Sequence, residues 1–431
     1  MNLIEKLSLK WKNISHPFLI HPSGNLSFSE ILSQKRVDLS LIRRGDVVAL
    51  IGDFNPSSIL ILLRLIDLDV IIVPLTIETR DDHRYFFDSA LVDVVIENAR
   101  ATRLKHQDNH PMIEKLRKRG NPGLVLFSTG TTGRPKAILH DLSYFLKRFD
   151  TPRPQLRTLN FLLFDHIGGI NTLLHTLFNR GVVVAPEDRS VDGILKTCAI
   201  HNVEVLPTTP TFLRIMLMSG VIPDGFPSSV RIITYGTERM DQPTLDKLCD
   251  SLPKVDFRQT FGMSELGIVR VKSKSRKSLF MKVGGEGVET RVVKNVLQIR
   301  SANRMLGYLN APSPFDQEGW YDTKDMVEKK DEFYKIVGRT NEVINVGGLK
   351  CLASEIERVA LTYPNIALVK AYGKENPITG QHAEIIVQPQ NADSFDKVTF
   401  KKFLHDHLQN HMIPRKIRVE QVKVGHRHKR I

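Results

Sequence analysis

The chain has 431 residues, of which 41% are hydrophobic and 25% are charged, ordinary values for a globular protein with room for two or three domains. Lys and Arg outnumber Asp and Glu by 61 to 47, a formal net charge of +14. The three cysteines lie far apart without a CxxC pair, so disulfides are not expected and a reducing cytoplasm is predicted.

The N-terminal residues, MNLIEKLSLKWKN, interleave apolar side chains with Glu5, Lys6 and Lys10, so no signal peptide is expected. The most apolar stretch, residues 59–75, is interrupted by Arg64 and by two aspartates. Such interruptions favour a packed helix that leads into a strand over a membrane span. The sequence therefore predicts a cytoplasmic protein without a membrane span.

The first 340 residues alternate short apolar runs with longer amphipathic ones, the pattern of an α/β protein with mostly parallel sheets. Strands are predicted at residues 47–51, 70–73, 94–96, 124–127, 182–184, 203–206 and 230–234. Helices are predicted at residues 56–68, 170–177 and 210–218. From residue 284 to 300 the pattern approaches two-residue alternation, which indicates an antiparallel or barrel-like portion.

The pattern changes again near residues 338–341, and residues 342–388 predict a separate small α+β unit. The predicted fold is therefore α/β in two domains. Residues 1–339 form a large N-terminal domain of doubly wound subdomains plus a barrel-like portion. Residues 340–431 form a small α+β C-terminal domain, with a hinge near Asn341.

The last 31 residues are strongly basic, with nine cations and two acids. A basic segment of this kind can bind nucleic acid, but Phe403 is its only aromatic residue. Without interleaved aromatic residues, a solvated basic face or an attraction for phosphate-bearing ligands is favoured. No nucleic-acid partner is expected.

The most informative segment is STGTTGRPK, which follows the apolar run 124–127. Its first six residues are Ser128, Thr129, Gly130, Thr131, Thr132 and Gly133, and Pro135 and Lys136 close it. A glycine-rich turn that leaves a buried strand can direct backbone N–H groups at an anion, while hydroxyls and an ammonium add donors and charge. The spacing fits neither GxxxxGK[ST] nor GxGxxG. A triphosphate site is predicted, and a solvated turn is the alternative.

Three later segments are weak when taken singly. FRQTFGMSE at residues 257–265 alone suggests a turn after a strand. GWYDTKD at residues 319–325 ends in an acid suited to a ribose diol, and IVGR at residues 336–339 places a strand before an arginine. The order and spacing of all these segments together are far more specific than any one of them.

Together these motifs resemble the acyl-adenylate-forming superfamily, which comprises acyl- and aryl-CoA ligases, the adenylation domains of non-ribosomal peptide synthetases, and luciferases. STGTTGRPK resembles the family's phosphate loop. Residues 261–265 resemble its YGxTE motif, residues 321–325 its YxTGD motif, and residues 338–341 its GRxD motif. Residues 345–350 and 354–357 resemble the start of its mobile C-terminal domain. The resemblance covers residue 124 to the C-terminus. The short N-terminal part is similar to compact aryl-acid ligases such as the o-succinylbenzoate-CoA ligases.

The resemblance implies that the loop and its neighbours bind the phosphates of ATP. The implied loop residues are Ser128, Thr129, Gly130, Thr131, Thr132 and Lys136. Thr129, Thr131, Thr132 and Lys136 would hold the β- and γ-phosphates. Ser264 would donate to the α-phosphate, and Glu265 would bind Mg²⁺, a hard cation that takes few carboxylates.

The resemblance also implies a nucleoside site. Phe261, followed by Gly262, would lie against adenine as a flat apolar face. Asp325 would accept hydrogen bonds from both ribose hydroxyls, and Arg339 would reach the same ribose. These roles agree with the chemistry of the side chains.

Two more segments line the adenine and acyl sites in the family. Tyr235, Gly236, Thr237 and Glu238 stand where the family has GGE. His166, in a segment that resembles xFHxxG, stands where a histidine lines or gates the acyl pocket, and a buried, satisfied histidine is the alternative. Ile167 lies near the position where amino-acid-activating members carry an aspartate. An aromatic or medium-chain acid without an α-amine is therefore expected.

The family's adenylation lysine has its best match in Lys429, which would bridge the carboxylate and the α-phosphate. His428 replaces the usual glycine before it. Alternatively Lys429 is one more cation of a basic tail, and Arg427 or Lys423 takes the role. Lys350, at the start of the mobile domain, is a further cofactor-binding candidate.

The implied reaction has two half-steps. A carboxylate attacks the α-phosphorus of ATP to give acyl-AMP and pyrophosphate, and the thiol of coenzyme A then displaces AMP. The small domain would rotate about the Asn341 position in between. Two alternatives stay open: transfer to the phosphopantetheine arm of an acidic acyl carrier protein, drawn by the basic C-terminal domain, and a non-catalytic nucleotide-binding relative.

Overall fold

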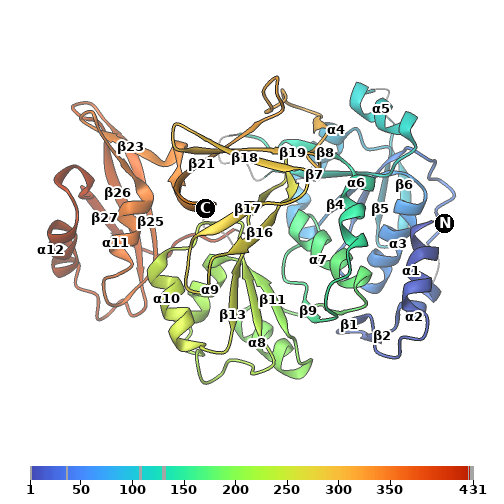
Figure 1. Cartoon of the computed structure of the whole chain (residues 1–431), viewed down its shortest axis with the longest axis horizontal. Coiled ribbons are helices and arrows are strands. Elements are labelled where there is room, and N and C mark those ends of the chain that lie inside the picture. Colours follow the sequence, from blue (N-terminus) through green and yellow to red (C-terminus); the bar gives the residue numbers. More distant parts are fainter. Residues whose placement is uncertain (1, 35–36, 106–108, 129–132, 426, 428–431) are drawn as a thin grey trace.

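The computed structural model describes residues 2–34, 37–105, 109–128, 133–425 and 427. They form a large N-terminal α/β portion, a barrel-like antiparallel sheet and a smaller C-terminal α+β domain, which lies at one end of the molecule (Figure 1). The predicted fold class is confirmed, including the barrel-like portion.

The first sheet has, among the described residues, seven strands in the order β20-β8-β7-β4-β3-β5-β6. Its parallel strands are β3 (Val47–Ile51), β4 (Ile71–Leu75), β5 (Val94–Glu97) and β7 (Gly123–Phe127). Its antiparallel strands are β6 (Arg100–Arg103), β8 (Ala137–Asp141) and β20 (Gly307–Tyr308). The four parallel strands correspond to four predicted ones.

Both faces of this sheet are buried, because successive side chains of a strand point to opposite faces. On β3, Val48 and Leu50 belong to one core cluster, whereas Val47 and Ala49 belong to another. Helices that contribute to the first cluster are α1 (Leu3–Trp11), α2 (Phe28–Ser33), α3 (Pro56–Asp67), α6 (Leu142–Lys147) and α7 (Ile167–Phe178). Those that contribute to the second are α4 (His83–Ala90) and α5 (Pro111–Arg119).

The second sheet follows the order β13-β12-β11-β9-β10-β1-β2 within the described part of the chain. Its strands are β1 (Leu19–His21), β2 (Gly24–Leu26), β9 (Arg157–Leu159), β10 (Val182–Val184), β11 (Val205–Thr208), β12 (Ile232–Tyr235) and β13 (Asp256–Gln259). All neighbouring pairs are parallel except β1 with β2. Its other helices are α8 (Val191–Ile200), α9 (Pro210–Met218) and α10 (Gln242–Ser251).

The barrel-like sheet is antiparallel, in the order β16-β17-β22-β21-β19-β18. Its strands are β16 (Arg270–Ser273), β17 (Met281–Gly284), β18 (Val288–Val293), β19 (Val296–Ser301), β21 (Tyr321–Lys330) and β22 (Phe333–Arg339). The short pair β14 (Gly262–Met263) and β15 (Gly267–Ile268) precedes it. The antiparallel pair of β18 and β19 confirms the antiparallel portion predicted from residues 284–300.

The C-terminal domain begins after the 3₁₀ turn Thr340–Glu342, which follows β22 directly. Its strands are β23 (Val343–Val346), β24 (Leu349–Leu352), β25 (Ile366–Asn376), β26 (Gly380–Pro389) and β27 (Lys416–Val419). Its helices are α11 (Ala353–Ala360) and α12 (Lys397–His407). These elements enclose a core of their own, with Ile356, Val369 and Phe400 fully buried.

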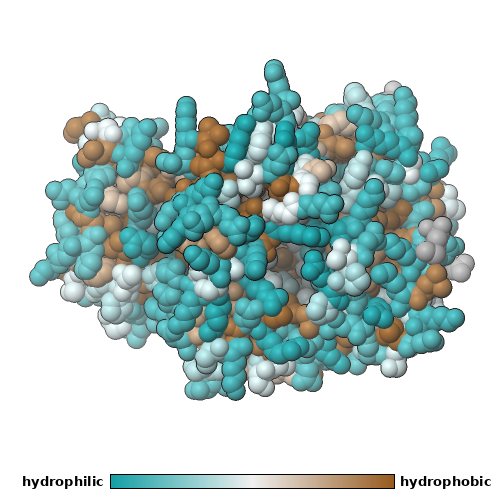
Figure 2. Space-filling view, viewed as in Figure 1, coloured by the Kyte–Doolittle hydropathy of each residue, from teal (hydrophilic) through white to brown (hydrophobic). Residues whose placement is uncertain are grey.

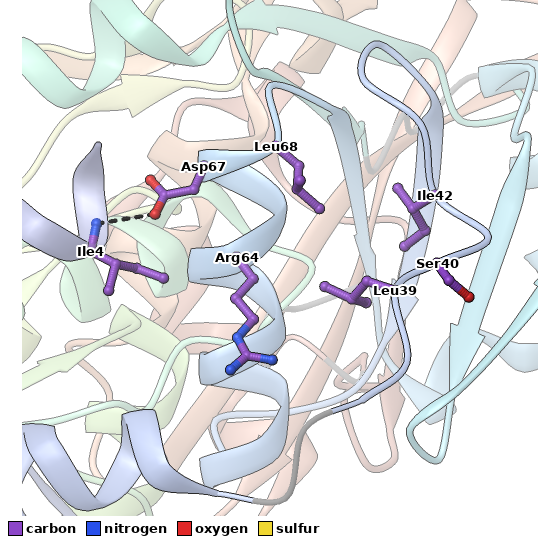
Figure 3. Close-up of a pocket in the computed structure, with 7 residues that line it drawn as sticks. All are labelled: Ile4, Leu39, Ser40, Ile42, Arg64, Asp67 and Leu68. Atoms are coloured by element: carbon purple, nitrogen blue, oxygen red, sulfur yellow. Dashed lines mark hydrogen bonds between the residues drawn. The ribbon is translucent and has the colours of Figure 1, made fainter. Parts of the chain in front are cut away.

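Asp67, the last residue of α3, holds the N-terminus of helix α1. The Asp67 carboxylate accepts hydrogen bonds from the N–H groups of Leu3 at 2.7 Å and Ile4 at 3.2 Å. Burial raises the pKa of Asp67. Figure 3 shows the pocket beside this contact, whose lining residues are Ile4, Leu39, Ser40, Ile42, Arg64, Asp67 and Leu68. The contact anchors the helix by its N-terminus, where an anion is favourable.

In the described ranges no helix combines the length and the apolar character needed to cross a bilayer. The face seen in Figure 2 is covered mainly by hydrophilic side chains, with hydrophobic residues in small separate patches. Scattered apolar residues of this kind are normal on a globular protein.

Candidate active site

The two ends of the STGTTGRPK segment are joined to each other. The N–H of Ser128 donates to the carbonyl of Lys136 at 3.0 Å, and the N–H of Lys136 donates to Ser128 Oγ at 3.0 Å. Tyr85 Oη donates to the carbonyl of Pro135 at 2.8 Å. The predicted ligands Thr129, Gly130, Thr131 and Thr132 lie outside the described residues. The base of the loop is thus fixed on β7 and β8.

Tyr308 brings Lys136 and Glu265 to one place. Its hydroxyl donates to Glu265 Oε1 at 2.7 Å, and Lys136 Nζ lies 4.9 Å from the centre of its ring. Burial, reinforced by the charge of Glu265, raises the pKa of Tyr308, so the phenol stays protonated as a donor. The predicted phosphate ligand and the predicted Mg²⁺ ligand therefore share one tyrosine, which the sequence reasoning missed.

Ser264 is held by a buried histidine of β8. His140 Nε2 donates to the carbonyl of Ser264 at 2.6 Å. Burial lowers the pKa of His140 to about 4, and therefore the ring is neutral at pH 7. The hydrogen bond joins the first sheet to the segment that carries Ser264 and Glu265. His140 follows an apolar run in the sequence, and no motif identified it.

Asp325 and Arg339 face each other across the β21–β22 hairpin. Arg339 Nε donates to Asp325 Oδ1 at 2.9 Å, and the Asp325 side chain is 5% exposed against 47% for Arg339. Burial raises the pKa of Asp325. The N–H of Asp325 donates to Thr323 Oγ1, and Lys324 between them has a positive φ of 61°. Glycine takes that conformation without strain, which explains the glycine of the TGD motif.

The predicted adenine side lies at the carboxyl ends of β12 and β13. The N–H of Thr260 donates to the carbonyl of Tyr235 at 2.7 Å. A Cβ on Gly236 would lie 2.1 Å from Thr260 Oγ1, so only glycine fits between the two segments. The side chain of Tyr235 is 1% exposed in the core of the second sheet, and its carbonyl also accepts from Thr260 Oγ1 at 3.1 Å. Phe261 is half-buried, and Thr237 follows Gly236 with a positive φ of 69°.

His166 caps helix α7. Its Nδ1 accepts from the N–H of Gly168 at 3.0 Å, and the side chain is half-buried. Ile167 is the first residue of the helix and is buried. The neutral tautomer with a proton on Nε2 is required for this cap. This geometry is compatible with both predictions for His166, a residue that gates the acyl pocket and a histidine whose hydrogen bonds are satisfied within the protein.

Within the described part of the chain, two ion pairs join the small domain to the large one. Arg427 Nη2 donates to Asp165 Oδ2 at 2.7 Å. Asp165 directly precedes His166 in the chain. Arg239 Nη2 donates to Glu357 Oε2 on α11 at 3.4 Å. The sequence reasoning named Arg427 only as an alternative to Lys429, and it missed Asp165.

Two further predicted residues are Lys350 and Lys429. Lys350 is exposed on β24 in the small domain, opposite Asn345 of β23. Lys429, together with His428, lies outside the described residues.

The donor set around Glu265 fits a nucleotide with a hard cation. In the described part of the chain no three His, Cys, Asp or Glu side chains gather as metal ligands. A Mg²⁺ ion at Glu265 would therefore complete its shell with phosphate and water oxygens, as Mg²⁺ commonly does beside a nucleotide. Lys136, which lies on the same tyrosine, would supply positive charge for those phosphates.

Known proteins share this sequence pattern and this fold. Residues 39–297 match the family described as AMP-binding enzyme. The 4-coumarate-CoA ligase 1 of Narcissus pseudonarcissus is 24% identical over 317 residues, which cover 64% of this chain and 57% of that protein. The chain thus aligns with less than two thirds of this curated relative.

Two solved structures have the same fold over almost their whole length. The o-succinylbenzoate CoA synthetase (MenE) of Bacillus subtilis, in complex with OSB-AMP, matches with a TM-score of 0.76 and 17% identity and covers 100% of this chain and 96% of that one. The anthranilate CoA ligase AuaEII, in complex with anthranoyl-AMP, matches with a TM-score of 0.84 and 16% identity and covers 100% and 95%. At these identities the match concerns the fold. Because the family match spans more than half of the sequence, the chain belongs to the AMP-binding enzyme family.

Proposed function

We propose that the protein is an AMP-forming acid–thiol ligase. It activates a carboxylic acid with ATP as acyl-AMP, releases pyrophosphate, and passes the acyl group to the thiol of coenzyme A. The observation that carries the proposal is the grouping of Lys136 and Glu265 on the ring and the hydroxyl of Tyr308. A cation and a carboxylate on one buried tyrosine suit a polyphosphate and its Mg²⁺.

In the first half-step the acid's oxygen attacks the α-phosphorus, and the bond to the bridging oxygen of pyrophosphate breaks. The protein's work is positioning and charge stabilisation. Lys136 takes up charge on the leaving pyrophosphate, Ser264 donates to the α-phosphate, and Asp325 with Arg339 holds the ribose. Mg²⁺ at Glu265, when bound, neutralises phosphate charge. Phe261 and the backbone beside Gly236 enclose the adenine.

In the second half-step the thiolate attacks the acyl carbonyl, and AMP leaves with the electron pair of the broken mixed anhydride. We propose that the small domain turns about the region of Asn341 between the half-steps. The 3₁₀ turn Thr340–Glu342, between two domains with separate cores, is the geometry that supports a pivot there. Lys429 is the proposed adenylation lysine, and Lys350 the proposed small-domain ligand.

We propose that the acid lacks an α-amine and is aromatic or of medium length. The position near Ile167 offers only apolar surface, and the neighbouring Asp165 carboxylate is engaged by Arg427. Within the turn, the Asp165 carboxylate already has Arg427 as its counter-charge, so it attracts an ammonium weakly even though its Oδ1 accepts no hydrogen bond from the described residues. The relatives named for coumarate, o-succinylbenzoate and anthranilate support an aromatic acid.

The test is carboxylate-dependent exchange of labelled pyrophosphate into ATP over a panel of aryl, fatty and amino acids. We expect exchange with aryl or medium-chain acids and none with amino acids. Exchange with no acid would contradict the enzyme and favour a nucleotide-binding relative. Coenzyme A or a carrier protein bearing its arm is then added to the active acid. A thioester on the carrier alone would contradict coenzyme A as the acceptor.

A further inference from the structure

The last residue that the structure describes contacts the large domain. Arg427 Nη2 donates to Asp165 Oδ2 at 2.7 Å, and the two residues are 262 positions apart in the sequence. Their side chains are 11% and 4% exposed. Two charges taken out of water depend on each other, because either one alone would stay buried without its counter-charge.

The pair can form only while the small domain lies close to α7. Beyond β27, Val422 is buried and its N–H donates to Gln388 Oε1 of β26 at 2.9 Å. Arg427 comes five residues later, so it can lie at most about 18 Å along the chain from this attachment. The position of Arg427 is therefore coupled to that of the small domain.

Asp165 lies on a turn that is itself rigid. Phe164, just before it, is fully buried and packs edge-on against Phe54, with ring centres 5.3 Å apart. His166, just after it, caps α7 through Gly168. An ion pair with such a turn fixes the approaching segment relative to His166 and Ile167, where we place the acid.

We propose that the Asp165–Arg427 pair positions the small domain on the acid-binding turn during adenylation and opens before the thioester step. The role rests on the proposed function. Arg427 is a positioning residue, two places before the predicted adenylation lysine Lys429, which lies outside the described residues. A second contact, Arg239 with Glu357 on α11, steadies the same arrangement.

The experiment separates the two half-steps in Arg427→Gln and Asp165→Asn. We expect pyrophosphate exchange to fall about a hundredfold in kcat, because a misplacement of about 1 Å is enough for such a loss. The KM for ATP should stay within a few-fold. Thioester formation from preformed acyl-AMP should stay unchanged or rise. A role in folding alone would lower both half-steps together.

Further variants sharpen the assignment. Arg427→Lys keeps the charge without the planar fork, and should restore exchange partly. The double variant Asp165→Asn with Arg427→Gln should lose no more than either single one, since both break the same contact. Lys416→Gln, at an exposed position on β27, is the charge-matched control and should exchange like the wild type.

The outcomes distinguish the pair from the activity. An active wild type whose exchange survives Arg427→Gln, or equal loss in both half-steps, overturns the positioning role. A wild type that exchanges with no acid contradicts the proposed function instead. Hydrogen–deuterium exchange then tests the contact: faster uptake at residues 160–170 in Arg427→Gln supports it, and unchanged uptake overturns it.

Discussion

Charged side chains are partnered differently in two regions of the site: the phosphate side, formed by Lys136, Glu265 and Tyr308, and the α7 side, formed by Asp165 and Arg427. On the phosphate side, Glu265 is bonded to a neutral phenol, and Lys136 lies against the ring of the same residue. On the α7 side, Asp165 and Arg427 are bonded to each other, in nearly complete burial. The first arrangement leaves charge for a ligand, whereas the second neutralises it within the protein.

This difference separates binding from positioning. Charges that are paired inside a protein contribute little to a ligand, yet they set where two elements meet. Charges held by neutral donors keep their field for an incoming ion. We therefore expect substitutions on the phosphate side to slow the chemical step, and substitutions on the α7 side to misplace the small domain.

The largest effect is expected for a buried pair that stays within one domain. Arg214 Nη2 donates to Asp241 Oδ2 at 2.5 Å, and both residues are at most 3% exposed. Burial alone would raise the pKa of Asp241, but Arg214 and the hydrogen bonds from Thr244 outweigh it and lower the pKa to about 2. Asp241→Asn should lower the free energy of unfolding by about 3–5 kcal/mol.

Urea unfolding at pH 7 measures this loss. The contribution of Asp241 is present above its unfolded pKa of 3.8 and is lost as the pH falls towards about 2, so the gap to the wild type should close below pH 4. In the folded fraction of Asp241→Asn, pyrophosphate exchange and thioester formation should fall by the same factor. If it lost exchange selectively, the distinction between internal and inter-domain pairs would be wrong.

The next effect tests the charge of the phosphate side. Glu265→Gln keeps an acceptor for Tyr308 Oη and removes the negative charge. Pyrophosphate exchange should fall about 10²–10³-fold, the loss typical of one electrostatic contact in a transition state. The measurement is exchange over a series of Mg²⁺ concentrations at 25 °C. Recovery of the wild-type rate at high Mg²⁺ would show that Glu265 serves only affinity for the ion.

His140 should make the protein sensitive to acid. Its pKa is about 4 in the folded chain and 6.5 in the ordinary state, so between these values the unfolded chain binds the extra proton. Stability therefore falls as the pH falls from 6.5 to 4, by about 3 kcal/mol at 1.36 kcal/mol per unit. His140→Gln is less stable at pH 8 but should lose that slope. Parallel pH profiles of unfolding would contradict this.

The sequence offers motifs for the phosphate side and none for the Asp165–Arg427 contact, for a physical reason. Asp325 and Arg339 are 14 residues apart on one hairpin, and the loop bases Ser128 and Lys136 are 8 apart. Residues that are close in the sequence and in contact keep a fixed spacing, which can be identified as a motif. Asp165 and Arg427 belong to different domains and are 262 residues apart, so no local pattern in the sequence predicts their contact.

Strands and helices show the same limit. Helix 210–218 and strand 47–51 were predicted to the residue, because apolar runs with clear ends define them. Strands β1 and β9 have three residues each and were missed, because His21, Arg157 and Thr158 interrupt their apolar runs, whereas the equally short β10 is all valine and was predicted. His140 and Tyr308 were missed because each looks like a core residue, and only tertiary contact reveals its partner.

The smallest effect isolates the hydrogen bond on the phosphate side. Tyr308→Phe keeps the ring beneath Lys136 and removes only the donor to Glu265 Oε1. A hydrogen bond to a charged group contributes about 1.5 kcal/mol, so exchange should fall about tenfold. The matched control is Tyr334→Phe, whose hydroxyl bonds Thr290 Oγ1 at 3.1 Å within the barrel. It should lower stability slightly and leave exchange unchanged. Equal exchange in both variants would mean that Tyr308 acts through its ring alone, and that Glu265 is placed by its own backbone, whose carbonyl accepts from Met305.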